Sequence, residues 1–148
     1  MYIRPKQEVY LESWLKSWSD LLLKWAASNL EYIVSLSKIS EVFPFSKLSI
    51  EDLKEIFSYL VKKGYAKWRS NSSIRVFWKS LEELADELYE YALKRGFLEL
   101  TSFTILSEFP EKFKKLPPDE IPLILDLLVK KGKARWMKKK VAIRIELP

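Results

Sequence analysis

Apolar side chains recur every three or four residues near the start of the chain, and this spacing predicts a helix over residues 9–27. The apolar positions are Leu11, Trp14, Leu15, Trp18, Leu21, Leu22 and Trp25. They form one stripe on a helix, so we expect the tryptophans to pack into a core. A short β-branched run at 32–35 predicts a strand, and residues 38–43 predict a short helix that stops before Pro44.

The next apolar stripe predicts a helix that follows Ser49 and ends at Gly64. Serine is a favoured N-cap, acidic residues follow it in the first turn, and glycine supplies the left-handed conformation that ends many helices. Residues 65–69 and 74–78 then predict two strands joined by a serine-rich turn. Helix, strand, helix, helix and hairpin is the order of a winged helix-turn-helix domain.

A long internal repeat indicates that this domain occurs twice. The segment 61–68 (VKKGYAKW) returns 68 residues later as 129–136 (VKKGKARW). A repeat at this spacing is too long for a solenoid unit and has the size of a small domain. We therefore predict a helix-rich α+β protein of two tandem winged helix-turn-helix domains, residues 1–78 and 79–148.

The second copy has the same predicted elements as the first. Ser80 and Glu83 form a capping box at the start of a helix that ends at Gly96. The pattern then predicts a strand at 98–100, a short helix at 102–109 that stops before a proline, and a third helix at 119–132. A hairpin of residues 134–137 and 141–147 follows.

The composition excludes the commonest kinds of catalytic chemistry. The 148 residues include no histidine and no cysteine, so the usual general base, thiol nucleophile and thiolate metal ligand are missing. All three glycines stand at predicted helix ends, which leaves none for a phosphate-binding loop. We expect no enzyme activity, no cofactor and no metal. We also expect a cytoplasmic protein, because no signal peptide or membrane span is recognisable.

The positive charge is concentrated in the second predicted hairpin. The net charge is +6, and the basic residues of this region are Lys130, Lys131, Lys133, Arg135, Lys138, Lys139, Lys140 and Arg144. One interpretation is that Lys138, Lys139 and Lys140 contact the phosphates of nucleic acid or anionic lipid. The other, which we favour, is a solvated hairpin edge whose lysines prevent strand-to-strand aggregation.

The third helix of each domain has the wrong charge for reading DNA. A helix in the major groove needs exposed Arg, Lys, Asn or Gln, whereas these helices carry Glu51, Asp52, Asp119 and Glu120. In the second domain the helix is also apolar on more than one side, because Leu123 and Leu127 lie off the main stripe. A surplus apolar face on a small domain predicts a protein partner or the sister domain.

From Leu11 onward the chain resembles the vacuolar protein sorting-associated protein 25 family, whose members are ESCRT-II subunits. Residues 18–25 (WSDLLLKW) are similar to the family's pattern of Trp, two residues, three aliphatic residues, one residue and an aromatic. Residues 62–68, 74–78 and 81–83 are similar to its order of Lys-Lys-Gly, Trp, wing and Pro-Glu-Glu. Residues 102–104 (SFT) resemble its Val-Phe-Thr. The compact chain and its many lysines favour an archaeal version.

The resemblance implies a scaffold without catalysis. The first domain would dock sister winged-helix subunits of ESCRT-II, and the second would recruit and nucleate an ESCRT-III subunit for membrane remodelling and protein sorting. The protein would reach membranes peripherally, through its partners. The alternative is a tandem winged-helix DNA-binding protein, resembling a transcription factor, that uses its basic second wing.

The resemblance also indicates which residues contact these partners. It implies an ESCRT-III contact at Phe103, Thr104 and the adjoining surface of the second domain, where we include Leu123 and Leu127. The family's proline- and aromatic-rich N-terminal segment plugs into the sister subunits. Here that segment is reduced, and we expect its contacts from Tyr2, Ile3 and Pro5.

Overall fold

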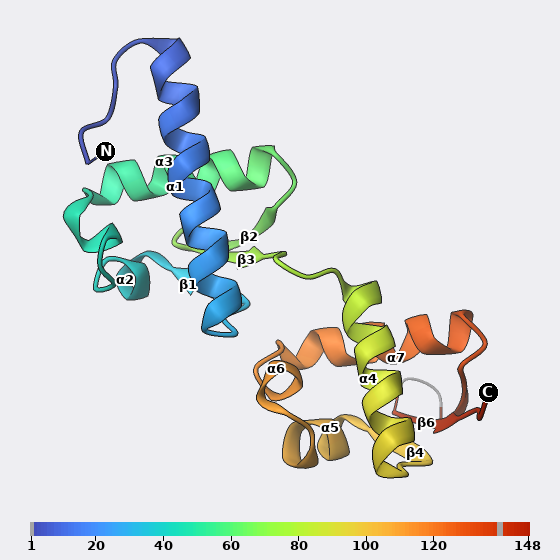
Figure 1. Ribbon diagram of the computed structural model, residues 1–148. Helices are drawn as coiled ribbons and strands as arrows, with labels where there is room; N and C mark the ends of the chain where they lie inside the picture. Colours follow the sequence, from blue (N-terminus) through green and yellow to red (C-terminus); the bar gives the residue numbers. More distant parts are fainter. Residues whose placement is uncertain (1, 139–140) are drawn as a thin grey trace. The chain divides into compact units, whose positions relative to one another are not determined.

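The computed structural model describes residues 2–138 and 141–148, which form two compact units, Met1–Trp78 and Lys79–Pro148 (Figure 1). Each unit is considered by itself. Each contains one three-stranded antiparallel sheet, with the strand order β1-β3-β2 in the first unit and β4-β6-β5 in the second. The two sheets therefore repeat one topology.

The first unit begins with the longest helix of the described chain, α1, which packs against α3. Its elements are α1 (Glu8–Ser28), β1 (Ile33–Ser35), α2 (Leu36–Ile39), the 3₁₀ turn η1 (Phe45–Lys47), α3 (Ile50–Lys62), β2 (Ala66–Ser70) and β3 (Ser73–Val76). The Ser49 hydroxyl caps α3 by accepting a hydrogen bond from the Asp52 N–H at 3.1 Å. Gly64, at φ +83°, ends that helical segment as predicted.

The short helix predicted at 38–43 is wrong in position. Helix α2 begins at Leu36, because the Ser35 hydroxyl accepts a hydrogen bond from the Lys38 N–H at 3.2 Å and caps the helix earlier. It ends at Ile39, and a turn follows that contains a cis peptide bond between Phe43 and Pro44. The buried residues of this helix, Leu36 and Ile39, lie three positions apart and so fill one helical turn.

The second unit repeats this plan and adds a helix that the pattern missed. Its elements are α4 (Leu81–Arg95), β4 (Glu99–Thr101), α5 (Ser102–Glu108), α6 (Glu111–Lys114), η2 (Pro118–Glu120), α7 (Ile121–Lys130), β5 (Ala134–Lys138) and β6 (Ala142–Ile145). Helix α6 buries Phe113 alone, and one apolar residue creates no periodic signal. The third helix was predicted from residue 119, whereas a 3₁₀ turn at Pro118–Glu120 precedes α7.

The two hairpins share an irregularity as well as a register. Trp68 pairs with Ile74 in the first, and Trp136 pairs with Ile143 in the second. In each hairpin the register of the strand pairing shifts directly after the tryptophan. Each unit therefore has the three helices, short strand and hairpin of a winged-helix domain, and the chain has a tandem winged-helix fold.

Aromatic side chains fill the core of the first unit. Trp18 is 0% exposed, and its ring lies 5.4 Å from that of Phe45 and 6.3 Å from that of Trp14. Trp25 is partly buried and packs against the same core. The prediction that the tryptophan stripe of α1 faces inward is confirmed.

We expect Trp18→Ala to lower the free energy of unfolding of the first unit by about 3–5 kcal/mol, because it removes a buried ring and leaves a cavity. Chemical denaturation followed by far-UV circular dichroism measures the change. Tyr10→Ala, on the exposed side of the same helix, should change stability by only about 0.5 kcal/mol. Equal losses in the two variants would contradict the assignment of Trp18 to the core.

Candidate partner-binding surfaces

The N-terminal segment turns back from the start of α1 toward α3 (Figure 1). The rings of Tyr2 and Trp18 lie 5.9 Å apart, and Arg4 Nε lies 2.7 Å from Glu55 Oε1 on α3. Between these two contacts the side chain of Ile3 is 86% exposed, while Pro5 is half-buried. The segment predicted to meet a sister subunit thus lies against its own domain and presents Ile3 to solvent.

The start of α5 presents an aromatic side chain. Phe103 is 80% exposed in the first turn of this helix. The Thr101 hydroxyl caps α5 by accepting a hydrogen bond from the Thr104 N–H at 3.1 Å, and the two threonine hydroxyls lie 3.0 Å apart. Of the predicted pair, Phe103 is therefore free to contact a partner, while Thr104 is half-buried and helps to hold the turn that presents it.

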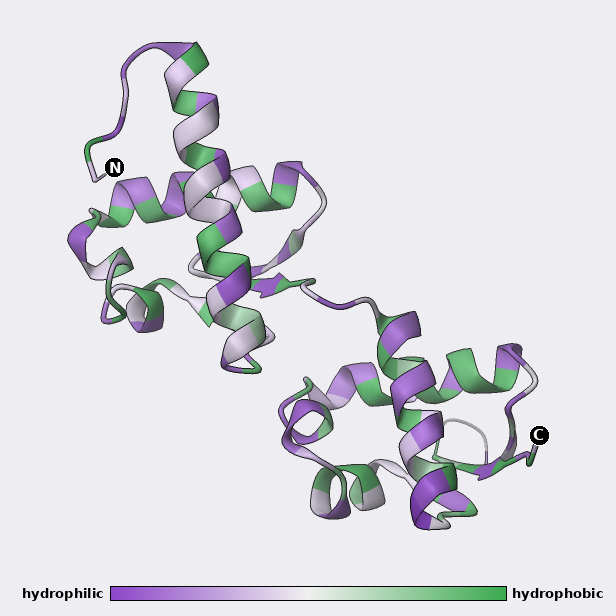
Figure 2. Ribbon diagram, in the orientation of Figure 1, coloured by the Kyte–Doolittle hydropathy of each residue, from purple (hydrophilic) through white to green (hydrophobic). Residues whose placement is uncertain are grey.

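Helix α7 is apolar over much of its surface, as Figure 2 shows. Its buried residues are Ile121, Ile124, Leu125 and Leu128. The side chain of Leu123 is 52% exposed, and Leu127 is half-buried. Phe103 and Leu123 lie on helices with different neighbours, since α5 packs against β4 and α6 whereas α7 packs against α4 and β5. The described contacts do not bring the predicted partner residues of the second unit into one patch.

Four of the eight residues of the basic cluster are paired with carboxylates. Lys131 Nζ and Lys133 Nζ lie 3.1 and 3.2 Å from Asp86 Oδ1 on α4. The other two pairs are Lys130 with Asp126 at 2.9 Å and Arg135 with Glu146 at 3.2 Å. Lys138 is exposed at the end of β5, and Lys139 and Lys140 lie outside the described residues. Half of the cluster thus has a local counter-charge, and Lys131 and Lys133 share a single carboxylate.

Two neighbouring carboxylates of α4, Asp86 and Glu87, form ion pairs with lysines from other segments of the second unit. Hydrogen bonds from Lys131 and Lys133 lower the pKa of Asp86. At Glu87 burial acts to raise the pKa, but hydrogen bonds from Lys112 and Lys79 outweigh it and the pKa is lowered. Lys112 Nζ lies 2.7 Å from Glu87 Oε1, and Lys79 Nζ lies 2.8 Å from Oε2. One carboxylate thus ties α6 and Lys79, which lies two residues before α4, to α4 itself.

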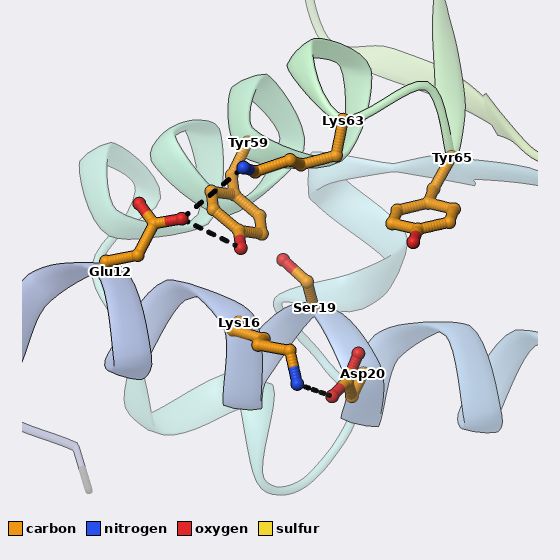
Figure 3. A pocket seen from close by; sticks show the side chains of 7 residues that line it. All are labelled: Glu12, Lys16, Ser19, Asp20, Tyr59, Lys63 and Tyr65. Carbon is orange, nitrogen blue, oxygen red and sulfur yellow. Dashed lines mark hydrogen bonds and ion pairs between the residues drawn. The ribbon is translucent and has the colours of Figure 1, made fainter.

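A cleft of about 300 Å³ lies between α1 and α3 in the first unit (Figure 3). Its lining residues are Glu12, Lys16, Ser19, Asp20, Tyr59, Lys63 and Tyr65. The Tyr59 hydroxyl donates a hydrogen bond to Glu12 Oε1 at 3.3 Å, and Lys63 Nζ lies 3.5 Å from the same oxygen. Partial burial and the Glu12 carboxylate raise the pKa of Tyr59.

The sequence analysis missed this cleft, although one signal for it was present. Ser19 stands beside Trp18 in a helix whose neighbouring buried positions are apolar, and its side chain is 2% exposed. A hydroxyl at a core position is a polar group that needs a hydrogen-bond partner. Tyr59 and Tyr65 gave no such signal, because tyrosines near the end of an amphipathic helix are commonplace.

The described part of the chain offers neither a metal site nor a membrane-spanning helix. Within residues 2–138 and 141–148, three or more His, Cys, Asp or Glu side chains nowhere gather in a way that could hold a metal ion. Within the same ranges, each helix is too short or too polar to cross a bilayer.

Comparison with known proteins identifies the family. The two winged-helix units place this chain in the class of tandem winged-helix proteins. A family model described as ESCRT-II complex subunit matches residues 1–108. The chain belongs to this family of ESCRT-II complex subunits.

The curated relatives match part of the chain. Vacuolar protein-sorting-associated protein 25 of Xenopus laevis is 29% identical over 90 residues, which cover 55% of this chain and 52% of that protein. The Danio rerio protein of the same name is 26% identical over 92 residues, which cover 57% and 53%. The matched region spans about half the length of these relatives.

Solved structures match over nearly the whole chain. The crystal structure of subunit VPS25 of ESCRT-II has a TM-score of 0.73 at 18% identity, and the match covers 97% of this chain and 93% of that one. A chain of the crystal structure of the endosomal complex ESCRT-II (VPS22/VPS25/VPS36) has a TM-score of 0.68 at 16% identity, with 98% and 93% covered. At this identity, the likeness establishes the fold.

We expect Glu87→Gln to lower the free energy of unfolding of the second unit by about 1 kcal/mol at neutral pH, because it weakens two charge-assisted contacts. The folded-state pKa of Glu87 is depressed, so its contribution is present above the unfolded-state pKa and disappears as the pH falls through the folded-state pKa. The stability curves of variant and wild type should therefore converge in acid.

Urea unfolding at a series of pH values between about 7 and 3 measures this convergence. Glu90→Gln, at an exposed position of the same helix, is the matched control and should leave the curve unchanged. A constant offset between wild type and Glu87→Gln at every pH would show that the ion pairs are not its origin.

Proposed function

We propose that this chain is a non-catalytic scaffold subunit of an ESCRT-II-like complex that acts in protein sorting. Its first unit docks sister winged-helix subunits, and its second unit recruits and nucleates an ESCRT-III subunit for membrane remodelling. The observation that carries the proposal is the family match over residues 1–108, which includes all of the first unit and extends into α5. The protein works in the cytoplasm and reaches membranes peripherally, through these partners.

Exposed apolar side chains support a protein-binding role for the second unit. Phe103 stands almost free of its own domain, and burying an aromatic ring of this kind at an interface is a common source of binding energy. Leu123, with Leu127 beside it on the next helical turn, provides a second apolar contact. Thr104 contributes indirectly, because its hydroxyl and N–H fix the turn that carries Phe103.

The N-terminal segment supports the contact with sister subunits. Tyr2 and Arg4 fasten it to the first unit, and Ile3 is left as the side chain that a partner can bury. The structure of the ESCRT-II complex of VPS22, VPS25 and VPS36 contains a chain of the same fold, which supports sister subunits as the partners.

Charge argues against the alternative of a DNA-binding protein. Phosphate contacts need cations that are free to approach the backbone, whereas Lys131, Lys133 and Arg135 each have a carboxylate within 3.2 Å. The third helix of the first unit opens with Glu51 and Asp52, which would repel phosphate in a groove. Contact of Lys138, Lys139 and Lys140 with lipid phosphate stays a secondary role within the scaffold proposal.

We expect Phe103→Asp to weaken binding of the intact protein to an ESCRT-III subunit of its own organism by about 2 kcal/mol or more, because a charge replaces an exposed anchor. Leu123→Asp should weaken it by less, since that side chain is already half-covered. Isothermal titration calorimetry measures both, and Glu108→Lys, at an exposed position of α5 on another face from Phe103, is the control for a changed charge.

A salt-titrated assay on random duplex DNA separates the two functions. A scaffold should show little affinity for DNA at physiological salt and a shallow salt dependence with its protein partner. Tight DNA binding that falls steeply with salt, together with no ESCRT-III binding, would overturn the proposal while leaving the fold unaffected.

We expect Ile3→Asp to weaken association with the sister subunits about tenfold or more, because it places a charge at the exposed apolar tip of the segment. Lys6→Asp, at an exposed position outside this tip, is the control for the added charge. Size-exclusion chromatography of the reconstituted complex with light scattering measures assembly. Full assembly of the Ile3→Asp variant would remove the N-terminal segment from the proposed interface.

A further inference from the structure

We propose that the cleft between α1 and α3 binds a neutral amide group, from an Asn or Gln side chain or from the main chain, of a sister subunit. The proposal rests on the proposed ESCRT-II function and adds a second contact to the N-terminal segment. It is carried by the buried Ser19 hydroxyl, which has no hydrogen-bond partner among the described residues. Figure 3 shows this hydroxyl directed into the cleft, toward the side of Tyr59 and Tyr65.

The orphaned hydroxyl indicates a guest that forms hydrogen bonds. A buried polar group without a partner costs free energy, and such groups in folded proteins usually find protein or water to bond to. The Ser19 hydroxyl can both donate and accept, and so can the hydroxyl of Tyr65 at the mouth of the cleft. An amide carries both a donor and an acceptor, so it can form hydrogen bonds with hydroxyls of this kind.

The charges of the cleft indicate that the guest is neutral. Each carboxylate is matched by a lysine: Glu12 lies 3.5 Å from Lys63, and Asp20 lies 3.8 Å from Lys16. A guest with a net charge would be repelled by one member of each pair as it approached the other. The Tyr59 hydroxyl is already donated to Glu12, so it remains available only as an acceptor.

The size and lining of the cleft favour a polypeptide over a free small molecule. About 300 Å³ is at the lower limit of small-molecule sites, and it suits one inserted side chain or a short stretch of main chain. Tyr65 at its edge is half-exposed, and tyrosine is enriched in protein interfaces because its ring packs while its hydroxyl bonds. The family of complex subunits supplies such a partner.

The test compares stability and binding, because the proposal predicts opposite signs for them. Ser19→Ala removes an unsatisfied buried hydroxyl from a helix, so the free protein should melt at an equal or higher temperature. The same variant should bind the reconstituted sister subunits about three- to tenfold more weakly, which is the loss of one hydrogen bond. Tyr65→Phe should weaken binding without destabilising the protein.

Ser17→Ala is the matched control, because Ser17 is exposed on the same helix and does not line the cleft. It should gain the helix propensity of alanine and bind as the wild type does. The ratio of wild-type to Ser19→Ala affinity should also be the same at low and high salt, since the guest is uncharged.

Four results would overturn the proposal. If Ser19→Ala lowers the melting temperature, the hydroxyl is bonded within the protein. If Ser19→Ala and Tyr65→Phe bind the sister subunits as the wild type does, the cleft is not part of the interface, although the scaffold function stands. If the affinity ratio falls as salt rises, the guest is charged. If the wild type binds no sister subunit, the proposed function fails and this contact fails with it.

Discussion

The small size of each winged-helix unit is the constraint on which the rest of the structure depends. A domain of this length buries little surface for each residue, so large side chains must fill its core. Trp18 and Phe45 do so in the first unit. In the second unit the ring of Phe109 lies 5.9 Å from that of Phe113 and 5.1 Å from that of Phe97. With both cores filled, the apolar side chains that remain outside are available for partners.

Ion pairs stabilise the second unit and also reduce its usable positive charge. Asp86 and Glu87 on α4 form ion pairs with lysines from the end of α7, the turn before β5, helix α6 and the segment that leads into α4. These contacts connect the hairpin and the short helices to one central helix. The same contacts place carboxylates beside these lysines, which lowers the local positive potential of this surface. A cluster of lysines in a sequence therefore overstates the local attraction for phosphate where the fold brings carboxylates beside it.

The repeat and the apolar stripes predicted the order of elements in both units, because helix caps and glycine stops act locally. Gly64, Gly96 and Gly132 all adopt the positive φ expected of helix ends. The pattern failed at two short helices: the local cap of Ser35 starts α2 earlier than predicted, and α6 buries Phe113 alone. A four-residue helix has too few positions to show a period.

The partner-binding role of the candidate surfaces stays a prediction. The exposure of Phe103 and Leu123 agrees with a role in binding, but a sequence cannot show that Thr104 is engaged in a cap or that Asp86 pairs with two lysines. These facts depend on which side chains the fold brings together. The cleft at Ser19 also depends on which side chains the fold brings together, because its walls come from two helices that are far apart in the sequence.

The N-terminal segment has a further consequence for the thermodynamics of assembly. Tyr2 and Arg4 hold it against α1 and α3 before any partner arrives. A disordered tail loses conformational entropy when it binds, and this loss is subtracted from the affinity. Here most of that ordering occurs when the domain folds. At the interface proposed above, a short segment with one exposed isoleucine would therefore contribute more binding free energy per buried atom than a longer, unstructured plug of the same composition.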